Sequence, residues 1–136
     1  KKRVITEYLD DLNHVNNVQY LLWVQEVAKK HWESLTGENI DRHHFWVVRS
    51  HQIDYKYSAK LKDELLINTY VGKTQDYISE RIVEFFLMPT KKLITRCNTK
   101  WCYVNRVNGK LKKIPKSIID LLKNQELNSS LPSIKT

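Results

Sequence analysis

The sequence predicts one α+β domain in which a curved antiparallel sheet wraps around one long helix. A single segment, residues 18–35, has helical periodicity over its whole length, and several strand-like segments follow it. Strands and helices do not alternate along the chain, which disfavours a doubly wound parallel sheet. With 136 residues the chain has the length of one domain. We therefore expect a single domain over residues 1–136, with a polar tail over residues 124–136.

The long helix is predicted from apolar side chains that recur at helical spacing: Val18, Leu21, Leu22, Val24, Val27, Ala28, His31, Trp32 and Leu35. Tyr20 and Trp23 add apolar surface on further faces, so the helix should be largely buried. Asn16 is a suitable N-cap, since its side-chain oxygen can accept a free backbone N–H. Gly37 is a typical residue at a helix end.

The other elements are predicted from alternation and turn residues. A short strand is expected at residues 2–8, a loop at residues 9–16, and four strands at residues 45–57, 64–73, 78–88 and 93–107. Asn108-Gly109 indicates a tight turn, and residues 115–123 a short helix with Pro115 in its first turn. Aromatic residues in the later strands are expected in the core or in a pocket wall, among them Phe85, Trp101 and Tyr103.

Composition and cysteine placement narrow the class of protein. No segment has 18 consecutive apolar residues and no N-terminal stretch resembles a signal peptide, so neither a membrane span nor secretion is expected. Cys97 and Cys102 lie five residues apart in one predicted strand, which places them on opposite faces. Two buried thiols in a reducing cytoplasm are the simplest interpretation.

Positive charge is concentrated in the C-terminal part of the chain. The formal net charge is +8, and residues 91–123 hold ten Lys and Arg against one acidic residue, Asp120. Such a segment is often only a solvated surface, but it can also hold phosphates, an acidic protein partner or nucleic acid. Since no RNA- or DNA-binding motif accompanies the charge, no nucleic-acid partner is predicted.

Chemistry-bearing residues gather at the entrance to the long helix. Asp10 and Asp11 lie just before His14, Asn16 and Asn17. A helix N-terminus presents unpaired N–H groups and partial positive charge, which suits it to hold an oxyanion. A carboxylate and an imidazole beside it could activate water or orient a carbonyl. The same residue types are also common caps and turn formers, so both interpretations stay open here.

The sequence lacks the motifs of several other enzyme classes. The three glycines are too far apart for a GxSxG elbow, which argues against an α/β-hydrolase serine enzyme. The sequence has no HExxH motif, P-loop or dinucleotide fingerprint. His43-His44 is a lone pair, which is poor evidence for a metal site. Neither a metal nor a cofactor is therefore expected.

The helix entrance DDLNHVNNVQYLLW, residues 10–23, resembles that of the hotdog-fold acyl-CoA thioesterases of the 4-hydroxybenzoyl-CoA thioesterase type. It is also similar to the helix entrance of plant acyl-ACP thioesterases, in which an Asp is followed by HVNN, an aromatic residue and a Trp. Downstream, RSHQIDYKYSAKLKDELLINTYV is similar to the family's second and third strands, and KWCYVN followed by KKIP to its last strand and closing segment. The resemblance covers nearly the whole chain.

This resemblance implies the hotdog fold and the hydrolysis of an acyl thioester to a free acid and a thiol. It implies that Asp10 is the catalytic carboxylate, acting as a general base or as a nucleophile. His14 corresponds to the histidine of the plant-type motif, and Asn17 to the position whose backbone N–H polarises the thioester carbonyl. By the same resemblance, Asn16 and Tyr20 are candidates for substrate binding.

Two neighbours of Asp10 bear on that assignment. Leu12 stands where plant-type enzymes carry an Asn, so the sequence favours Asp10 over a catalytic Asn–His pair. Asp11 is the nearest alternative base, and spacing favours Asp10.

The resemblance also implies partners: an acyl-CoA or acyl carrier protein substrate, and a second copy of the chain in a homodimer or homotetramer. The alternative functions on the same fold are an acyl-thioester dehydratase and a non-catalytic acyl-CoA-binding protein, because a fold does not fix a function.

Overall fold

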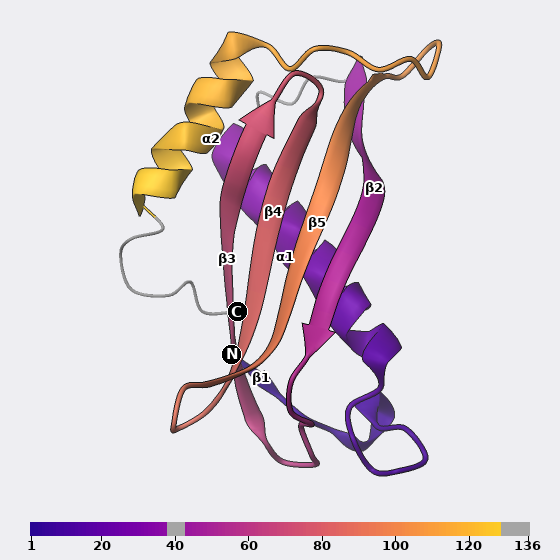
Figure 1. The fold of residues 1–136 in the computed structure, drawn as a ribbon, viewed down its shortest axis with the longest axis vertical. Coiled ribbons are helices and arrows are strands. Elements are labelled where there is room, and N and C mark those ends of the chain that lie inside the picture. The colour runs from indigo at the N-terminus through magenta and orange to yellow at the C-terminus, as the bar shows by residue number, and fades with distance from the viewer. Residues whose placement is uncertain (38–42, 129–136) are drawn as a thin grey trace.

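The structure, a computed structural model, describes residues 1–37 and 43–128, the last five of them by their backbone alone. Its elements in chain order are β1 (Lys2–Arg3), the 3-10 helix η1 (Thr6–Tyr8), α1 (Asn17–Thr36), β2 (His44–Tyr55), β3 (Glu64–Gln75), β4 (Ile78–Leu87), β5 (Lys92–Asn105) and α2 (Lys116–Asn128). The strands form one curled antiparallel sheet in the order β1-β3-β4-β5-β2, α1 runs diagonally across one face, and α2 lies beside β3 (Figure 1). The predicted α+β class and antiparallel sheet are confirmed.

Helix α1 begins and ends where the local chemistry predicted. The Asn16 side chain accepts the backbone N–H of Val18 at 2.9 Å, and Gly37 closes the helix at φ 55° with its N–H donated to the Glu33 carbonyl. The expectation of a largely buried helix is only partly right. Val18 is 61% exposed and Leu22 54%, so one apolar stripe of α1 is left uncovered within this chain.

The sheet is built from long, nearly continuous antiparallel pairings. β5 pairs with β4 on one side and with β2 on the other, and β3 pairs with β4. A register shift between Val48 and Ser50 interrupts the pairing of β2 with β5. β2 is therefore the last strand at one edge of the sheet, with twelve residues and a pairing partner on one side only in the part of the chain that the structure describes.

Two predicted boundaries differ from the structure. The strand expected at residues 2–8 is confined to Lys2–Arg3, because the chain turns into η1 and brings the Tyr8 ring edge-on against Trp23, with 5.0 Å between ring centroids. Helix α2 continues to Asn128, beyond the predicted end at residue 123. Of the polar tail predicted over residues 124–136, residues 129–136 lie outside the described residues.

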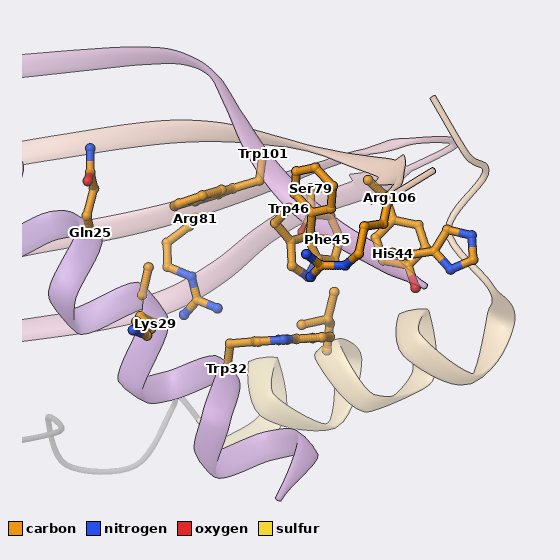
Figure 2. A pocket seen from close by; sticks show the side chains of 13 residues that line it. Gln25, Lys29, Trp32, His44, Phe45, Trp46, Ser79, Arg81, Trp101 and Arg106 are labelled. Atoms are coloured by element: carbon orange, nitrogen blue, oxygen red, sulfur yellow. The ribbon is translucent and has the colours of Figure 1, made fainter. Parts of the chain in front are cut away.

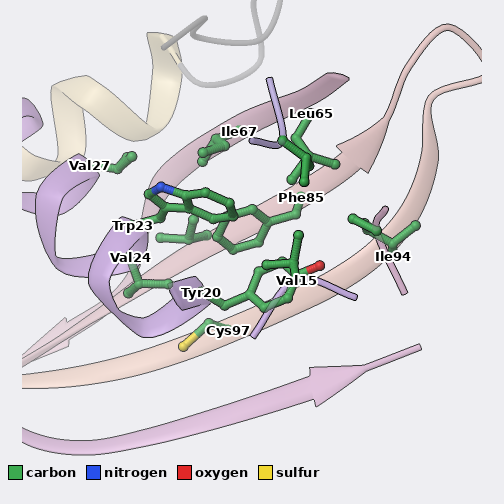
Figure 3. Close-up of a cluster of buried hydrophobic side chains, with 13 residues drawn as sticks. Val15, Tyr20, Trp23, Val24, Val27, Leu65, Ile67, Phe85, Ile94 and Cys97 are labelled. Carbon is green, nitrogen blue, oxygen red and sulfur yellow. The ribbon is translucent and has the colours of Figure 1, made fainter. Parts of the chain in front are cut away.

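The hydrophobic core fills the space between α1 and the sheet (Figure 3). Its centre is a group of fully buried side chains from α1 and three strands: Trp23, Val24, Leu65, Ile67, Val83, Phe85, Ile94 and Cys97. The rings of Trp23, Tyr20 and Phe85 meet at centroid distances of 5.0–6.1 Å. Phe85 is thus a core residue, as predicted. This packed layer holds α1 at a fixed height over the sheet.

Both cysteines are buried and free, as expected from their positions on one strand. Within the described residues, no helix is long and apolar enough to cross a membrane.

Candidate active site

The loop before α1 is held in a tight, specific shape by its own backbone. Leu9 and Val15 form an isolated antiparallel bridge, and the Asp10 N–H donates to the His14 carbonyl at 2.7 Å. Asn13 takes a left-handed conformation at φ 61°, which asparagine tolerates better than most residues. The Val15 N–H is donated to the Ala59 carbonyl at 2.9 Å, which fastens the loop to the segment after β2.

Asp10 stabilises a turn with one of its carboxylate oxygens, while the other oxygen makes no hydrogen bond within the described residues. Its Oδ1 accepts the backbone N–H of Leu12 at 2.9 Å and of His14 at 3.1 Å. These bonds fix the rotamer of the side chain. Its Oδ2 has no hydrogen-bond partner among the described residues, so one carboxylate oxygen is left for a ligand. The capping interpretation and the catalytic interpretation of Asp10 are therefore compatible.

The first residue of α1 supplies a free backbone donor. Asn16 places its own N–H on the Tyr8 carbonyl at 2.7 Å and caps Val18 with its side chain. No acceptor in the described part of the chain takes the N–H of Asn17, which is the first residue inside the helix. The helix dipole adds partial positive charge at this donor.

A pocket of about 140 Å³ opens at this end of α1. It is lined by Asp10, His14, Val15, Asn17, Tyr20, Tyr55, Lys56, Tyr57 and Ser58. The structure thus brings four of the five predicted site residues to one pocket. The exception is Asn16, whose side chain is engaged in the cap and does not line the pocket. Asp11, the alternative carboxylate, is exposed and also stands outside the lining.

The end of β2 and the segment that follows it, residues 55–58, form the opposite wall, which was not predicted from the sequence. The Tyr55 hydroxyl donates to the Asn17 carbonyl at 3.3 Å, a direct link between this wall and the helix start. Just beyond β2, the N–H groups of Lys56 and Tyr57 are both donated to the Ile94 carbonyl, at 2.8 and 3.2 Å. The wall therefore depends on the pairing of distant strands, which local sequence patterns do not reveal.

Two of the three tyrosines that line the pocket, Tyr20 and Tyr55, are held in their neutral form. Burial raises the pKa of Tyr20, with the Thr95 hydroxyl acting in the opposite direction, and burial also raises the pKa of Tyr55. Tyr20 is 2% exposed, and its hydroxyl has no hydrogen-bond partner of ordinary geometry in the described residues. The protonated Tyr20 hydroxyl is therefore a buried donor that lacks an acceptor within the described residues.

A larger cavity of about 450 Å³ lies along the C-terminal half of α1 (Figure 2). It is lined by Gln25, Ala28, Lys29, Trp32, His44, Phe45, Trp46, Ser79, Arg81, Trp101, Tyr103, Arg106 and Leu122. Trp101 and Tyr103 are pocket-wall residues, as predicted. The two pockets share no lining residue. Neither holds a metal site: in the described ranges, no group of His, Cys, Asp and Glu side chains is arranged to bind a metal ion.

This fold, a curled antiparallel sheet with a long helix across it, is that of the hotdog thioesterases. The chain belongs to the family described as the acyl-ACP thioesterase N-terminal domain, and the match covers residues 2–122. No curated protein sequence matches it.

Solved structures support the same fold. YbaW, a probable thioesterase from Escherichia coli, superimposes with a TM-score of 0.77 at 21% identity, over 91% of this chain and 95% of that one. A 1,4-dihydroxy-2-naphthoyl-CoA thioesterase from Synechocystis has a TM-score of 0.76 at 17% identity, with coverages of 92% and 94%. A Staphylococcus aureus protein solved in complex with CoA has a TM-score of 0.82 at 15% identity, with coverages of 99% and 85%. At these identities the likeness establishes the fold.

Proposed function

We propose that this protein hydrolyses acyl thioesters, with its reacting centre in the pocket at the start of α1. The observation that carries the proposal is the meeting of a fixed carboxylate with a free oxygen, on Asp10, and a free helix N–H, on Asn17, in one small pocket. At about 140 Å³ the pocket has room for a thioester group and a water molecule, whose share of the liquid is about 30 Å³.

In the reaction that this arrangement favours, the thioester oxygen accepts the Asn17 N–H. Asp10 takes a proton from water as the water oxygen attacks the carbonyl carbon. The tetrahedral intermediate then collapses, the C–S bond breaks, and the leaving thiolate takes up the proton. In the alternative, an Asp10 oxygen attacks the carbonyl carbon itself, and the C–S bond breaks to release the thiolate. Water then hydrolyses the resulting anhydride, which returns the Asp10 carboxylate, frees the acid and supplies the proton that the thiolate takes up. One oxyanion donor contributes about 10²–10³-fold in rate, and one acid–base group about 10²–10⁴-fold.

The remaining pocket residues have supporting roles in this proposal. The buried Tyr20 hydroxyl donates a hydrogen bond to the substrate, and His14 lines the pocket next to Asp10 and orients the thioester. Asn16 acts on the site indirectly, because its cap fixes where α1 begins and therefore where the Asn17 N–H lies.

The thiol handle is proposed to enter past the wall formed by residues 55–58. Lys56 lines the pocket, and the ammonium of Lys92 lies 3.5 Å from the ring centroid of Tyr57, so two cations stand where phosphates of the handle could bind. The likeness to a protein solved with CoA supports coenzyme A as the handle, and the family description supports a carrier protein. We favour an acyl-CoA, as in the 4-hydroxybenzoyl-CoA thioesterase type. Rates with one acyl group on each handle decide between them.

We further propose that the active form is a homodimer or a homotetramer. β2 leaves an unpaired edge within the described chain, and Val18 and Leu22 leave apolar surface on α1. Since the site wall begins at the end of β2, a partner that pairs with β2 would lie next to the pocket. Light scattering during size-exclusion chromatography measures the assembly.

The decisive experiment is thiol release from acyl-CoAs of different chain length, followed with a thiol-reactive dye. Asp10→Asn should lower kcat by about 10²–10⁴-fold. The fold should persist, because an amide oxygen can still accept the two backbone N–H groups. Asp11→Asn is the matched control, because it removes the same charge from the neighbouring residue, whose side chain is exposed. It should leave kcat within about twofold of the unmodified protein.

Three results would contradict hydrolysis by this site. Tight acyl-CoA binding without any thiol release would identify a non-catalytic binder. Loss of water from a hydroxyacyl thioester with the thioester bond intact would identify a dehydratase. Equal losses of rate in Asp10→Asn and Asp11→Asn would place the reacting carboxylate elsewhere.

A further inference from the structure

The cavity along the C-terminal half of α1 contains a buried cation, Arg81, that has no acidic partner among the described residues. Arg81 is 6% exposed, although it lies on the face of β4 that carries the core residues Val83 and Phe85. Its guanidinium contacts Nδ1 of His31 and donates from Nη1 to Thr69 Oγ1 at 3.3 Å. Over the described residues no carboxylate pairs with it. Figure 2 shows the Arg81 side chain reaching from the sheet toward α1.

Most N–H donors of the Arg81 guanidinium have no hydrogen-bond partner in the ranges that the structure describes. The guanidinium has five N–H donors, and both of its contacts use the same nitrogen. Burial lowers the pKa of Arg81 to about 10, so it remains charged at neutral pH. A buried charge that lacks a counter-charge is costly to the fold, and such groups are usually paired or bind a ligand.

The described residues that line the cavity add more donors and no counter-charge. The indole N–H groups of Trp46 and Trp101 are both buried and have no hydrogen-bond partner in the part of the chain that the structure describes. Lys29 and Arg106 also line the cavity, and no Asp or Glu among the described residues does. Most of the remaining wall is aromatic or aliphatic: Ala28, Trp32, Phe45, Tyr103 and Leu122. The cavity thus offers apolar walls, a buried cation and unused donors.

We infer that this cavity is a second binding site, which takes an amphipathic carboxylate: an apolar body among the aromatic rings and a carboxylate on Arg81. A carboxylate provides one negative charge and acceptors only, which matches a planar guanidinium fork. A neutral apolar chain would leave the charge and the indole N–H groups unsatisfied.

This site is separate from the pocket proposed for hydrolysis and does not depend on that proposal. The positions of Asn17 and Ala28 on α1 are about 16 Å apart along the helix axis. Between them stand fully buried core side chains, including Trp23 and Val24. The ligand is therefore a free carboxylic acid and not the reacting end of a thioester bound at Asn17.

Decanoate and decan-1-ol are suitable probes, because they share a chain and differ in charge. Trp32, Trp46 and Trp101 line the cavity, so binding can be followed by intrinsic fluorescence and confirmed by calorimetry. The full-length protein should bind decanoate about 10- to 100-fold more tightly than decan-1-ol, the range expected for hydrogen bonds to a charged group.

Arg81→Met should abolish the preference for decanoate while leaving the weak binding of decan-1-ol. Lys110→Met is the matched control, since it removes one positive charge from an exposed residue outside both pockets. Trp101→Phe keeps the aromatic wall and removes only the indole N–H, and should weaken decanoate binding by a few-fold. This variant tests the site even if Arg81→Met fails to fold.

Asp10→Asn separates this inference from the proposed hydrolysis. It should stop thiol release and leave decanoate binding unchanged. The inference is wrong if decanoate and decan-1-ol bind equally to the unmodified protein, or if neither binds. It is also wrong if the preference survives in folded Arg81→Met, or if Asp10→Asn abolishes decanoate binding.

Discussion

The charged groups near the two ends of α1 are stabilised to very different degrees. At its start, the charge of Asp10 is shared with two backbone N–H groups and lies in a small, half-open pocket. Along its C-terminal half, the charge of Arg81 is buried against a histidine and a threonine, in a cavity about three times as large. The first arrangement is stabilised by the local chain. The second leaves a polar group whose cost the described chain does not offset, as expected at a binding site.

The core layer that separates the two pockets, centred on Trp23, gives the largest predicted effect. Trp23 is 1% exposed and contacts Tyr8, Tyr20 and Phe85. Trp23→Ala should lower the free energy of unfolding by about 3–5 kcal/mol, the range for large aromatic residues in a core. Urea unfolding measures it. Leu22→Ala, on the exposed stripe of the same helix, should change it by less than about 0.5 kcal/mol in the monomer.

If Trp23→Ala and Leu22→Ala lowered the free energy of unfolding equally, either Trp23 would not form the barrier between the pockets or a partner chain would cover Leu22. Repeating the measurement at several protein concentrations distinguishes these, since only the second depends on assembly.

Because Arg81 is a buried charge, removing it should not destabilise the fold, unlike most substitutions of buried residues. Arg81→Met replaces a buried cation by an apolar side chain of similar length, and should leave stability unchanged or raise it by about 1–3 kcal/mol. Lys110→Met, at the surface, should stay within about 0.5 kcal/mol of the unmodified protein. Both are measured by urea unfolding without ligand. A loss of several kcal/mol in Arg81→Met would show instead that the cation is an integral part of the core.

Asp10 should behave in the opposite way. Asp10→Ala removes the acceptor of two backbone N–H groups, so it should cost about 1 kcal/mol, as the loss of a helix cap does. Asp11→Ala should be neutral, because the side chain of Asp11 is exposed. Thermal unfolding of the two variants measures the difference. Equal stabilities would mean that the turn holds its shape without the carboxylate of Asp10.

The features that could be predicted from the sequence are those that depend on residues close together in the chain. The limits of α1 follow from Asn16 and Gly37 beside a helical period, and the residues gathered near Asp10 lie within one short stretch of chain. Arg81 was not predicted, because β4 is apolar on both faces, with Ile82 on one and Val83 on the other. Only strand pairing decides which face meets α1. The wall at Tyr55 likewise depends on strand pairing far along the chain.

His51, on β2 between the two pockets, provides the smallest test. Its Nδ1 lies 2.8 Å from Thr99 Oγ1, and burial lowers the pKa of His51 from 6.5. The unfolded chain then binds more protons than the folded one as pH falls below about 6.5, so stability is lost through that window. Urea unfolding at about pH 7.5 and 5.5 should show a smaller loss in His51→Gln than in the unmodified protein. Since neither pocket contains His51, the substitution His51→Gln should leave decanoate binding and thiol release unchanged. If it altered both, β2 would couple the two ends of α1.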